Sequence, residues 1–314
     1  MNVLPARALA PAKINLGLFL GQARAEDGRH ELVTVMQSIS LADELTLEHA
    51  PAGVTEDEVV CPGVPGPPAQ NLAGAALKAF RVATGWDAPP LRLSIVKRIP
   101  VAAGMGGGSA DAAAALRLAS YASGRGEEAL LRELGAALGA DVPAQIAPGR
   151  WLATGAGERL EELPDPNQAS FGLLVLPAAA ELSTAAVYAQ ADRLGLGRSA
   201  EELQARRRAL RRALELSAAI PAAQELLDND LERAAISLCP EILATLGQAR
   251  EAGADVALVS GSGPTVVGLF PHANGLGRAE RAAAGLATDR SSAGLPAPVC
   301  ATPVDASFAR VTSV

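Results

Sequence analysis

IPVAAGMGGGSADAA, residues 99–113, is a glycine-rich segment between a strand-like run and an alanine-rich helical one. Gly104, Gly106, Gly107 and Gly108 have no Cβ that would keep an anion away from the backbone N–H groups. The helix that follows adds unpaired N–H groups and the positive end of its dipole. The order strand, glycine loop and helix therefore predicts a phosphate-binding loop.

Two familiar phosphate loops do not fit this segment. A Walker A loop needs the sequence Gly-Lys-Ser/Thr, and the segment contains no lysine. A dinucleotide fingerprint needs a third glycine at the position that Ser109 occupies. Ser109 can be the N-cap of the helix, or a hydroxyl ligand of a phosphate or a metal ion. A flexible turn that only joins strand to helix is the alternative interpretation.

The segment APAKINLGLFL at 10–20 alternates like a strand. One face would carry Ile14, Leu16, Leu18 and Leu20, and the other Lys13, Asn15, Gly17 and Phe19. A lysine here could stand at a strand edge, where it discourages aggregation. A cation and an amide that share a face favour a ligand instead.

Strand-like and helical patterns recur along the whole chain. Strands are predicted at 91–96, 172–176, 256–259 and 265–270, and helices at 71–83, 109–122, 127–138, 184–194, 199–218, 222–236 and 241–252. Two stretches, 51–68 and 286–299, are typical of irregular loops. We therefore predict an α/β or α+β protein, with a domain boundary at the Pro-Asp-Pro-Asn segment 164–167.

Composition and charge exclude several classes of protein. The 314 residues are 49% hydrophobic and carry a net charge of −7, which argues against binding to a nucleic-acid backbone. Cys61, Cys239 and Cys300 lack CxxC spacing and indicate reduced thiols rather than a disulfide frame or a zinc site. No apolar run approaches the roughly 18 residues of a membrane helix. Pro5 and Pro11 interrupt any signal-peptide core, so we expect a soluble, cytoplasmic protein.

An arginine-rich segment at 199–218 is the feature that would suggest a nucleic-acid partner. Ser199 and Glu202 have the spacing of a capping box, and the chain as a whole is acidic. We interpret the segment as a solvated helix face.

Three motifs in order resemble the GHMP superfamily, named for galactokinase, homoserine kinase, mevalonate kinase and phosphomevalonate kinase. PxxxGMGGGSA at 100–110 resembles the phosphate loop, APAKINL at 10–16 with DGRHEL at 27–32 the N-terminal motif, and SGSGPTVVGLF at 260–270 the third motif. The resemblance implies a kinase of small alcohols with an ATP-binding domain, 1–163, a substrate-binding domain, 164–314, and an active site in the cleft between them. ATP with Mg²⁺ would be a co-substrate, and no tightly bound cofactor is expected.

Further elements narrow the resemblance. QNL at 70–72, LGADVP at 138–143 and NDLE at 229–232 resemble a branch of the family that works in the non-mevalonate route to isoprenoid precursors. Its members phosphorylate the 2-hydroxyl of a methylerythritol unit in a cytidine diphosphate conjugate. The alternatives are another GHMP kinase that acts on a different small alcohol, and a catalytically silent nucleotide-binding protein of the same fold.

The resemblance also implies roles for the catalytic residues. Asp141 would be the general base, and Lys13 would stabilise the transferring phosphoryl group. From its local sequence alone, Asp141 reads instead as a helix N-cap or an Asx turn. Because a mere binder has no need of both groups, the pair argues against a silent protein.

By the same resemblance two sets of residues would bind the ligands. ATP would contact Asn71, Pro100, Val101, Ala102, Ala103, Gly104, Met105, Gly106, Gly107, Gly108 and Ser109. The substrate would contact Asn15, Arg29, His30, Tyr188, Gly261, Ser262 and Gly263. Asn71 could equally be a helix N-cap, and the second glycine group a tight turn.

The cytidine end of the substrate would meet His30 and Tyr188. Their alternatives are a hydrogen-bonded structural histidine and ordinary helix packing. Arg29 stands where the family usually has tyrosine, although a guanidinium can also stack on a base. No cluster of Asp, Glu and His identifies magnesium ligands, and Ser109 and Asp111 are the nearest options. The sequence leaves the oligomeric state open, with a homodimer as one option.

Overall fold

The computed structural model describes residues 4–64, 70–163, 171–216 and 226–314. Within these residues the first sheet has seven strands, and its main path runs in the order β11-β1-β2-β4-β3. The strands are β1 (Ala6–Ala23), β2 (His30–His49), β3 (Glu58–Val60), β4 (Leu91–Val96), β5 (Arg150–Gly155), β6 (Arg159–Glu162) and β11 (Thr312–Ser313).

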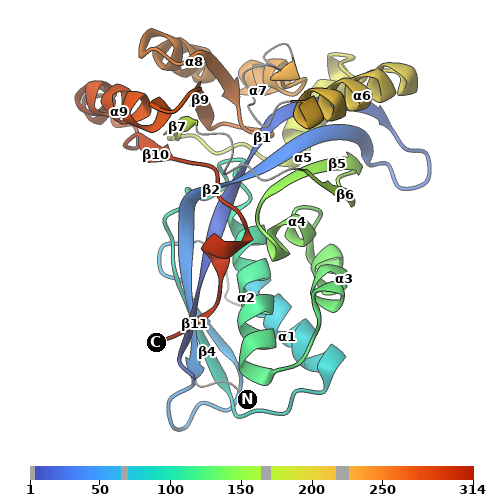
Figure 1. Cartoon of the computed structure of the whole chain (residues 1–314), viewed down its shortest axis with the longest axis vertical. Helices are drawn as coiled ribbons and strands as arrows, with labels where there is room; N and C mark the ends of the chain where they lie inside the picture. The colour runs from blue at the N-terminus through green and yellow to red at the C-terminus, as the bar shows by residue number, and fades with distance from the viewer. Residues whose placement is uncertain (1–3, 65–69, 164–170, 217–225) are drawn as a thin grey trace.

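The two long strands of this sheet organise the molecule. β2 pairs with β1 along most of its length, with β4 through residues 44–49 and with β5 through residues 32–37. Strand β5 in turn pairs with β6 on its other side. Figure 1 shows the helices that lie beside this sheet in the lower half of the view. They are α1 (Leu72–Thr84), α2 (Gly107–Ser123), α3 (Glu128–Leu138) and α4 (Val142–Ile146).

A second, antiparallel sheet of four strands has the order β10-β7-β9-β8. Its strands are β7 (Gly172–Leu176), β8 (Val256–Val259), β9 (Val266–Phe270) and β10 (Val299–Ala301). The helices around it, in the upper half of Figure 1, are α5 (Thr184–Arg193), α6 (Ala200–Leu216), α7 (Glu232–Leu238), α8 (Glu241–Glu251) and α9 (Gly275–Ser292). After β10 the chain returns to the first sheet through a 3₁₀ turn, Ala306–Ala309, and β11.

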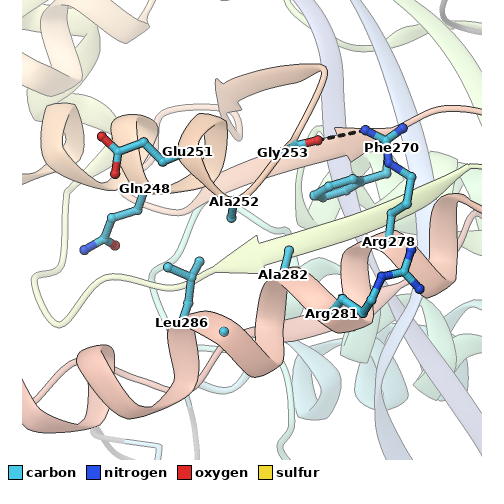
Figure 2. A pocket seen from close by; sticks show the side chains of 10 residues that line it. Gln248, Glu251, Ala252, Gly253, Phe270, Arg278, Arg281, Ala282 and Leu286 are labelled. Carbon is cyan, nitrogen blue, oxygen red and sulfur yellow. Dashed lines mark hydrogen bonds between the residues drawn. The ribbon is translucent and has the colours of Figure 1, made fainter.

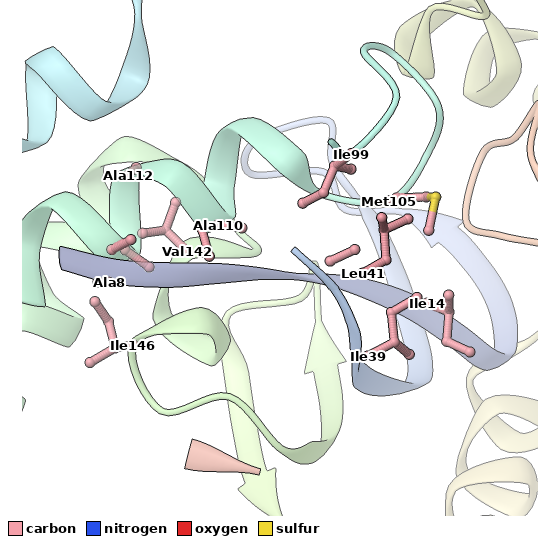
Figure 3. Close-up of a cluster of buried hydrophobic side chains, with 14 of the residues drawn as sticks. Ala8, Ile14, Ile39, Leu41, Ile99, Met105, Ala110, Ala112, Val142 and Ile146 are labelled. Atoms are coloured by element: carbon pink, nitrogen blue, oxygen red, sulfur yellow. The ribbon is translucent and has the colours of Figure 1, made fainter. Parts of the chain in front are cut away.

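Small side chains let helix α2 approach strand β1 closely. Ala110 and Ala112 of α2 are fully buried, as is Ala8 of β1. In Figure 3 they lie in one apolar cluster with Ile14 and Val142. The alanine-rich core thus holds the N-terminus of α2 against the strand that carries Lys13.

Strand β1 serves two cores. Ile14 and Leu16 belong to the cluster under the first sheet, whereas Leu18 and Leu20 belong to the cluster of the second. The expectation of one continuous apolar face was wrong, because the pairing with β2 shifts register between Asn15 and Gly17. Such a bulge re-aims the side chains that follow it.

Most predicted elements form, with a few corrections. The strands at 91–96, 172–176 and 256–259 and the helix at 241–252 appear within a residue of their expected bounds. The expected helix at 222–236 begins only at Glu232, because Asn229 pairs with Leu18 in an isolated bridge; residues 222–225 lie outside the described residues.

The two stretches predicted to be loops also contain regular structure. The segment 286–299 begins inside α9, which runs on to Ser292 because its serines and alanines are compatible with a helix. The stretch 51–68 contains the short strand β3, and 65–68 lie outside the described residues. The domain boundary at 164–167 also lies outside them, so that division stays a prediction.

The arginine-rich helix α6 has a capping box at its start and forms ion pairs with the first sheet. Its expected capping box is present, since Ser199 N–H donates to Glu202 over 2.8 Å and Glu202 N–H donates to the Ser199 hydroxyl over 3.2 Å. Arg207 and Arg211 both reach Glu161 of β6. These contacts tie the helix to the first sheet.

Candidate active site

A cleft of about 1150 Å³ lies between the two halves of the molecule. Its walls carry the N-terminal lysine motif, the glycine loop at 100–109, Asp141 and the start of α5. All the predicted site residues except Gly263 line it. The structure thus brings together residues that lie up to 249 positions apart, from Lys13 to Ser262.

Lys13 and Asp141 form a pair at the centre of the cleft. Lys13 Nζ lies 3.4 Å from Asp141 Oδ2 and donates to Asn15 Oδ1 over 2.8 Å. The lysine is buried, with 8% of its surface exposed, and its own N–H donates to the carbonyl of Met105 in the glycine loop. It is therefore not a solvated lysine at a strand edge.

Asp141 precedes helix α4 but does not cap it. It occupies the N-cap position, yet its side chain makes no capping hydrogen bond. About a third of the side chain remains exposed, toward the cleft that it lines. A carboxylate in this position can accept a proton from a bound hydroxyl group while the ammonium of Lys13 balances its charge.

Thr34 of β2 completes a chain of hydrogen bonds that the sequence did not reveal. Asn15 Nδ2 donates to Thr34 Oγ1 over 2.8 Å, while Asn15 Oδ1 accepts from Lys13. Both Asn15 and Thr34 are buried, so the chain fixes the direction in which Lys13 points.

The glycine loop leads straight into helix α2, as predicted, but the helix begins earlier. Gly106 is its N-cap with φ +67°, so Ser109 lies inside the first turn and the expectation of a Ser109 N-cap was wrong. No side chain caps this end, which leaves backbone N–H groups without side-chain partners at the cleft. Such a helix start favours an anion.

The two glycine-rich turns touch each other through their backbones. A Cβ on Gly104 would lie 2.5 Å from the carbonyl oxygen of Ser260 and 2.8 Å from that of Gly263. Gly263 is set back from the cleft and closes the tight turn, with its N–H donating to the Ser260 carbonyl. Gly261 and Ser262 are the members of this turn that reach the cavity.

The second glycine turn is held by Asn229, from the NDLE segment. Its Nδ2 donates to the carbonyl oxygens of Val259 and Gly261, and its Oδ1 accepts from the N–H of Leu231. The same segment bonds to β1, where Leu18 exchanges backbone hydrogen bonds with Asp228 and Asp230. Asn229 therefore positions the turn rather than lining the cleft.

One lobe of the cleft has an apolar wall and a charged floor. Asn71 caps α1 by accepting from the N–H of Ala73 over 2.9 Å, and it also lines this lobe. On the floor Lys97 Nζ donates to Asp43 and, over 2.7 Å, to Asp111. Sequence reasoning missed Asp43 and Lys97, which carry no motif of their own.

Asp43 and Asp111 have different roles on this floor. Asp43 accepts from the N–H of Arg98 and of Ile99 and so holds the start of the glycine loop. Asp111 is buried and its Oδ1 has no hydrogen-bond partner among the described residues. Burial, opposed by the positive charge of Lys97, raises the pKa of Asp111 to about 7.

The opposite lobe contains the residues predicted for a cytidine. The rings of His30 and Tyr188 lie 5.3 Å apart and are tilted by 53°. Arg29 donates to the carbonyl of Ala156 over 2.9 Å, and His30 Nε2 lies 2.7 Å from Asp192 Oδ1. Burial, reinforced by the charge of Asp141, raises the pKa of Tyr188 to about 12, so its hydroxyl stays protonated near neutral pH.

Figure 2 shows a separate cavity of about 520 Å³ between α8, α9 and β9. It contains none of the predicted site residues. Of its two arginines, Arg278 and Arg281, the first is already engaged, because it pairs with Asp255 at 2.9 Å and donates to the Gly253 carbonyl. The cleft is therefore the better candidate for chemistry.

The described ranges contain neither a metal-binding cluster nor a helix that could span a membrane. Across residues 4–64, 70–163, 171–216 and 226–314, no group of three or more His, Cys, Asp and Glu side chains could hold a metal ion. In the same part of the chain no helix has the length and apolar character needed to cross a membrane. Cys61, Cys239 and Cys300 are free thiols.

Two family models match the chain. "GHMP kinases N terminal domain" matches residues 71–149, and "GHMP kinases C terminal" matches residues 199–288. The first match contains the glycine loop and Asp141, and the second contains Asn229 and the second glycine turn.

Curated relatives share about 40% of their residues with this chain. A protein of Streptomyces coelicolor named 4-diphosphocytidyl-2-C-methyl-D-erythritol kinase is 43% identical over 269 residues, 84% of this chain and 87% of that protein. A protein of the same name from Nocardia farcinica is 41% identical over 316 residues, 95% of this chain and 97% of that protein.

Solved structures agree on the fold. A crystal structure of 4-(cytidine 5'-diphospho)-2C-methyl-D-erythritol kinase has a TM-score of 0.72 at 32% identity and covers 95% of this chain and 98% of its own. A homoserine kinase from Cytophaga hutchinsonii has a TM-score of 0.75 at 15% identity, with 99% of both chains covered, which shows the fold alone.

Proposed function

Because the chain belongs to the GHMP kinase family of ATP-dependent small-molecule kinases, we propose that it phosphorylates the 2-hydroxyl of 4-diphosphocytidyl-2-C-methyl-D-erythritol. The products would be the 2-phosphate and ADP, in the non-mevalonate route to isoprenoid precursors. The observation that carries the proposal is the Lys13–Asp141 pair between two glycine turns, in a chain about 40% identical to relatives with this name.

Phosphoryl transfer requires alignment of the two substrates and neutralisation of charge more than covalent chemistry by the protein. In our proposal Asp141 accepts the proton of the attacking hydroxyl. Lys13 stabilises both that carboxylate and the phosphoryl oxygens, since its Nζ lies 3.4 Å from Asp141 and its backbone is bonded to the glycine loop. Asn15, which fixes Lys13, would also contact the substrate hydroxyls.

We assign the phosphates of ATP to the loop at 100–109 and the start of α2. The N–H groups without a side-chain cap and the glycine at the N-cap support this assignment. Asn71 would contact the adenine or ribose in the lobe of the cleft that also contains Lys97 and Asp111. Mg²⁺ would arrive with the phosphates of ATP as part of the co-substrate.

We assign the cytidine diphosphate end of the substrate to the lobe with His30 and Tyr188. Tyr188 would stack on the base, and Arg29 would replace the stacking ring that the family usually has at that position. Gly261 and Ser262 also line the cleft and would contact the substrate there.

The test is direct phosphorylation. The purified chain is incubated with ATP, magnesium and the cytidine conjugate, and ³¹P NMR is followed for a new phosphomonoester resonance. Mevalonate, homoserine and galactose serve as competing alcohols, and the D141N variant is the matched control. If another alcohol reacts and the conjugate does not, the proposed substrate is refuted. If ATP binds but no alcohol is phosphorylated, the chain is a catalytically silent nucleotide-binding protein.

A further inference from the structure

One hydrogen bond joins the two halves of the molecule at the lobe of the cleft that contains His30 and Tyr188, the base lobe. His30 is the first residue of β2, and Asp192 lies in the last turn of α5. Their side chains meet through Nε2 and Oδ1 at 2.7 Å, a short distance for a bond of this kind. Only 9% of the His30 side chain is exposed, so the imidazole is held against the protein.

The identity of the acceptor decides where the imidazole carries its proton. A carboxylate can only accept a hydrogen bond, so Nε2 is the protonated nitrogen. No described residue bonds to Nδ1 of His30. In the neutral ring Nδ1 is therefore a free acceptor on a side chain that lines the cleft.

The same helix supplies a ring beside this acceptor. Tyr188 precedes Asp192 by four residues, and such spacing places both side chains on one face of α5. The Tyr188 ring packs 5.3 Å from the imidazole. One helix face thus provides a stacking surface and the carboxylate that orients the polar atom next to it.

We propose that Asp192 is a positioning residue that makes the cleft selective for cytosine over uracil. By fixing the proton of His30 on Nε2, it presents Nδ1 as an acceptor for the exocyclic amino group of the base. Uracil carries a carbonyl oxygen at that position, and two acceptors would then face each other. This inference rests on the proposed function, because it assigns the base lobe to a cytidine conjugate.

Three variants of the full chain test the role by kinetics. D192A removes the acceptor, and we expect KM for the cytidine conjugate to rise about ten- to a hundredfold with kcat and KM for ATP little changed. D192N keeps an amide oxygen that accepts from Nε2, and it should stay within about threefold of the wild type. Q190A, on the same helix, is the control, because the Gln190 side chain accepts a hydrogen bond from Arg193 rather than from His30.

The base preference is a readout that a merely structural role would not move. We expect the wild type to favour the cytosine conjugate over its uracil analogue on the order of a hundredfold in kcat/KM, and D192A to lose at least tenfold of that preference. D192N should retain it. If D192A raises both KM values equally, or leaves the preference intact, the proposal is refuted.

Histidine NMR tests the proton directly, without turnover. The chain has three histidines, so His30 can be assigned from the spectrum of an H30Q variant. At about pH 8.5, His30 in the wild type should show a protonated Nε2 and an unprotonated Nδ1 in ¹⁵N spectra. In D192A both tautomers of the neutral ring should be populated, so the ¹⁵N chemical shifts of Nδ1 and Nε2 should differ less than in the wild type. A protonated Nδ1 in the wild type would overturn the inference.

Ligand titration separates this inference from the proposed function. Cytidine diphosphate should shift the Nδ1 resonance of His30, and uridine diphosphate should not. If the wild type fails to phosphorylate the conjugate but shows this selective shift, the proposed function falls and the base preference stands. If the conjugate is phosphorylated but both nucleotides shift Nδ1 alike, the base preference falls alone.

Discussion

The carboxylate oxygen Oδ2 of Asp141 and the ammonium nitrogen Nζ of Lys13 lie 3.4 Å apart, with a glycine turn on each side of them. A Cβ on Gly106 would come within 3.7 Å of that oxygen, and one on Gly261 within 3.5 Å of that nitrogen. The pair therefore stands where two backbones can approach a phosphoryl group without interference from side chains.

Replacing Asp141 by asparagine should separate binding from chemistry. The amide cannot accept the proton of the attacking hydroxyl, so kcat should fall about 10²- to 10⁴-fold while the Kd for ATP stays within about threefold. Steady-state kinetics and calorimetric titration with ATP measure the two effects. D289N, on the exposed surface of α9, should behave like the wild type, and near-normal turnover of D141N would remove Asp141 as the base.

Two glycines at the ends of α2 provide a matched comparison. Gly106 at the N-cap has φ +67° and Gly124 at the C-cap has φ +66°, so alanine should lower the free energy of unfolding by about 1–2 kcal/mol at either position. Only at Gly106 would the new Cβ meet Lys13, 3.0 Å from Cγ; around Gly124 the space is open. We expect G106A to lose turnover and G124A to keep it. Urea unfolding measures the stability of both variants, and steady-state kinetics measures their turnover. Equal losses of activity would contradict a specific effect of the Cβ at Gly106 on Lys13.

Thr34 should matter through the residues that it orients. The T34V variant keeps the shape of the side chain but leaves Nδ2 of the buried Asn15 without its acceptor, at a cost of about 1–3 kcal/mol in the free energy of unfolding. Because Asn15 fixes Lys13, we also expect kcat to fall about tenfold. T84V, which removes a hydrogen bond to the Phe80 carbonyl inside α1, should lower stability without a change in kcat.

The buried carboxyl of Asp111 should make stability depend on pH. Its pKa is raised from 3.8 to about 7 on folding, mainly by burial, so between these values the folded chain holds a proton that the unfolded chain has released. The free energy of unfolding should therefore decrease as pH rises from about 4 to about 7. Relative to D111N, the wild type should lose about 1 kcal/mol per pH unit between pH 5 and 7. Urea unfolding at several pH values measures the difference, and parallel pH curves would contradict the assignment.

The local parts of the site were predictable from sequence. Lys13 and Asn15 share a strand face because they are two residues apart. The glycine loop could be predicted because its glycines are clustered directly before a helical pattern. The helix start was misjudged because Ser109 is a good N-cap residue, whereas the actual N-cap is Gly106, a glycine with positive φ three residues earlier. At this position the preference of serine for the N-cap is overridden by the backbone path of the glycine loop, which passes close to Lys13.

The residues that sequence reasoning missed depend on tertiary pairing. Thr34 reaches Asn15 across the pairing of β1 with β2, although the two residues are 19 positions apart in the sequence. Asp192 meets His30 across 162 positions, and Asp43 holds the loop start from β2. Each is a polar residue without a motif, and its role follows from the fold rather than from its neighbours in the sequence.

Strand β1 belongs to both halves, and this has a consequence for how the protein can be divided. An isolated piece ending at residue 163 would expose Leu18 and Leu20, which are buried only against the second core, and would lack the partner strand β11. Unfolding of either half therefore displaces the strand that carries Lys13. Activity should vanish in step with a single cooperative unfolding transition, so loss of turnover on heating reports the integrity of the whole chain.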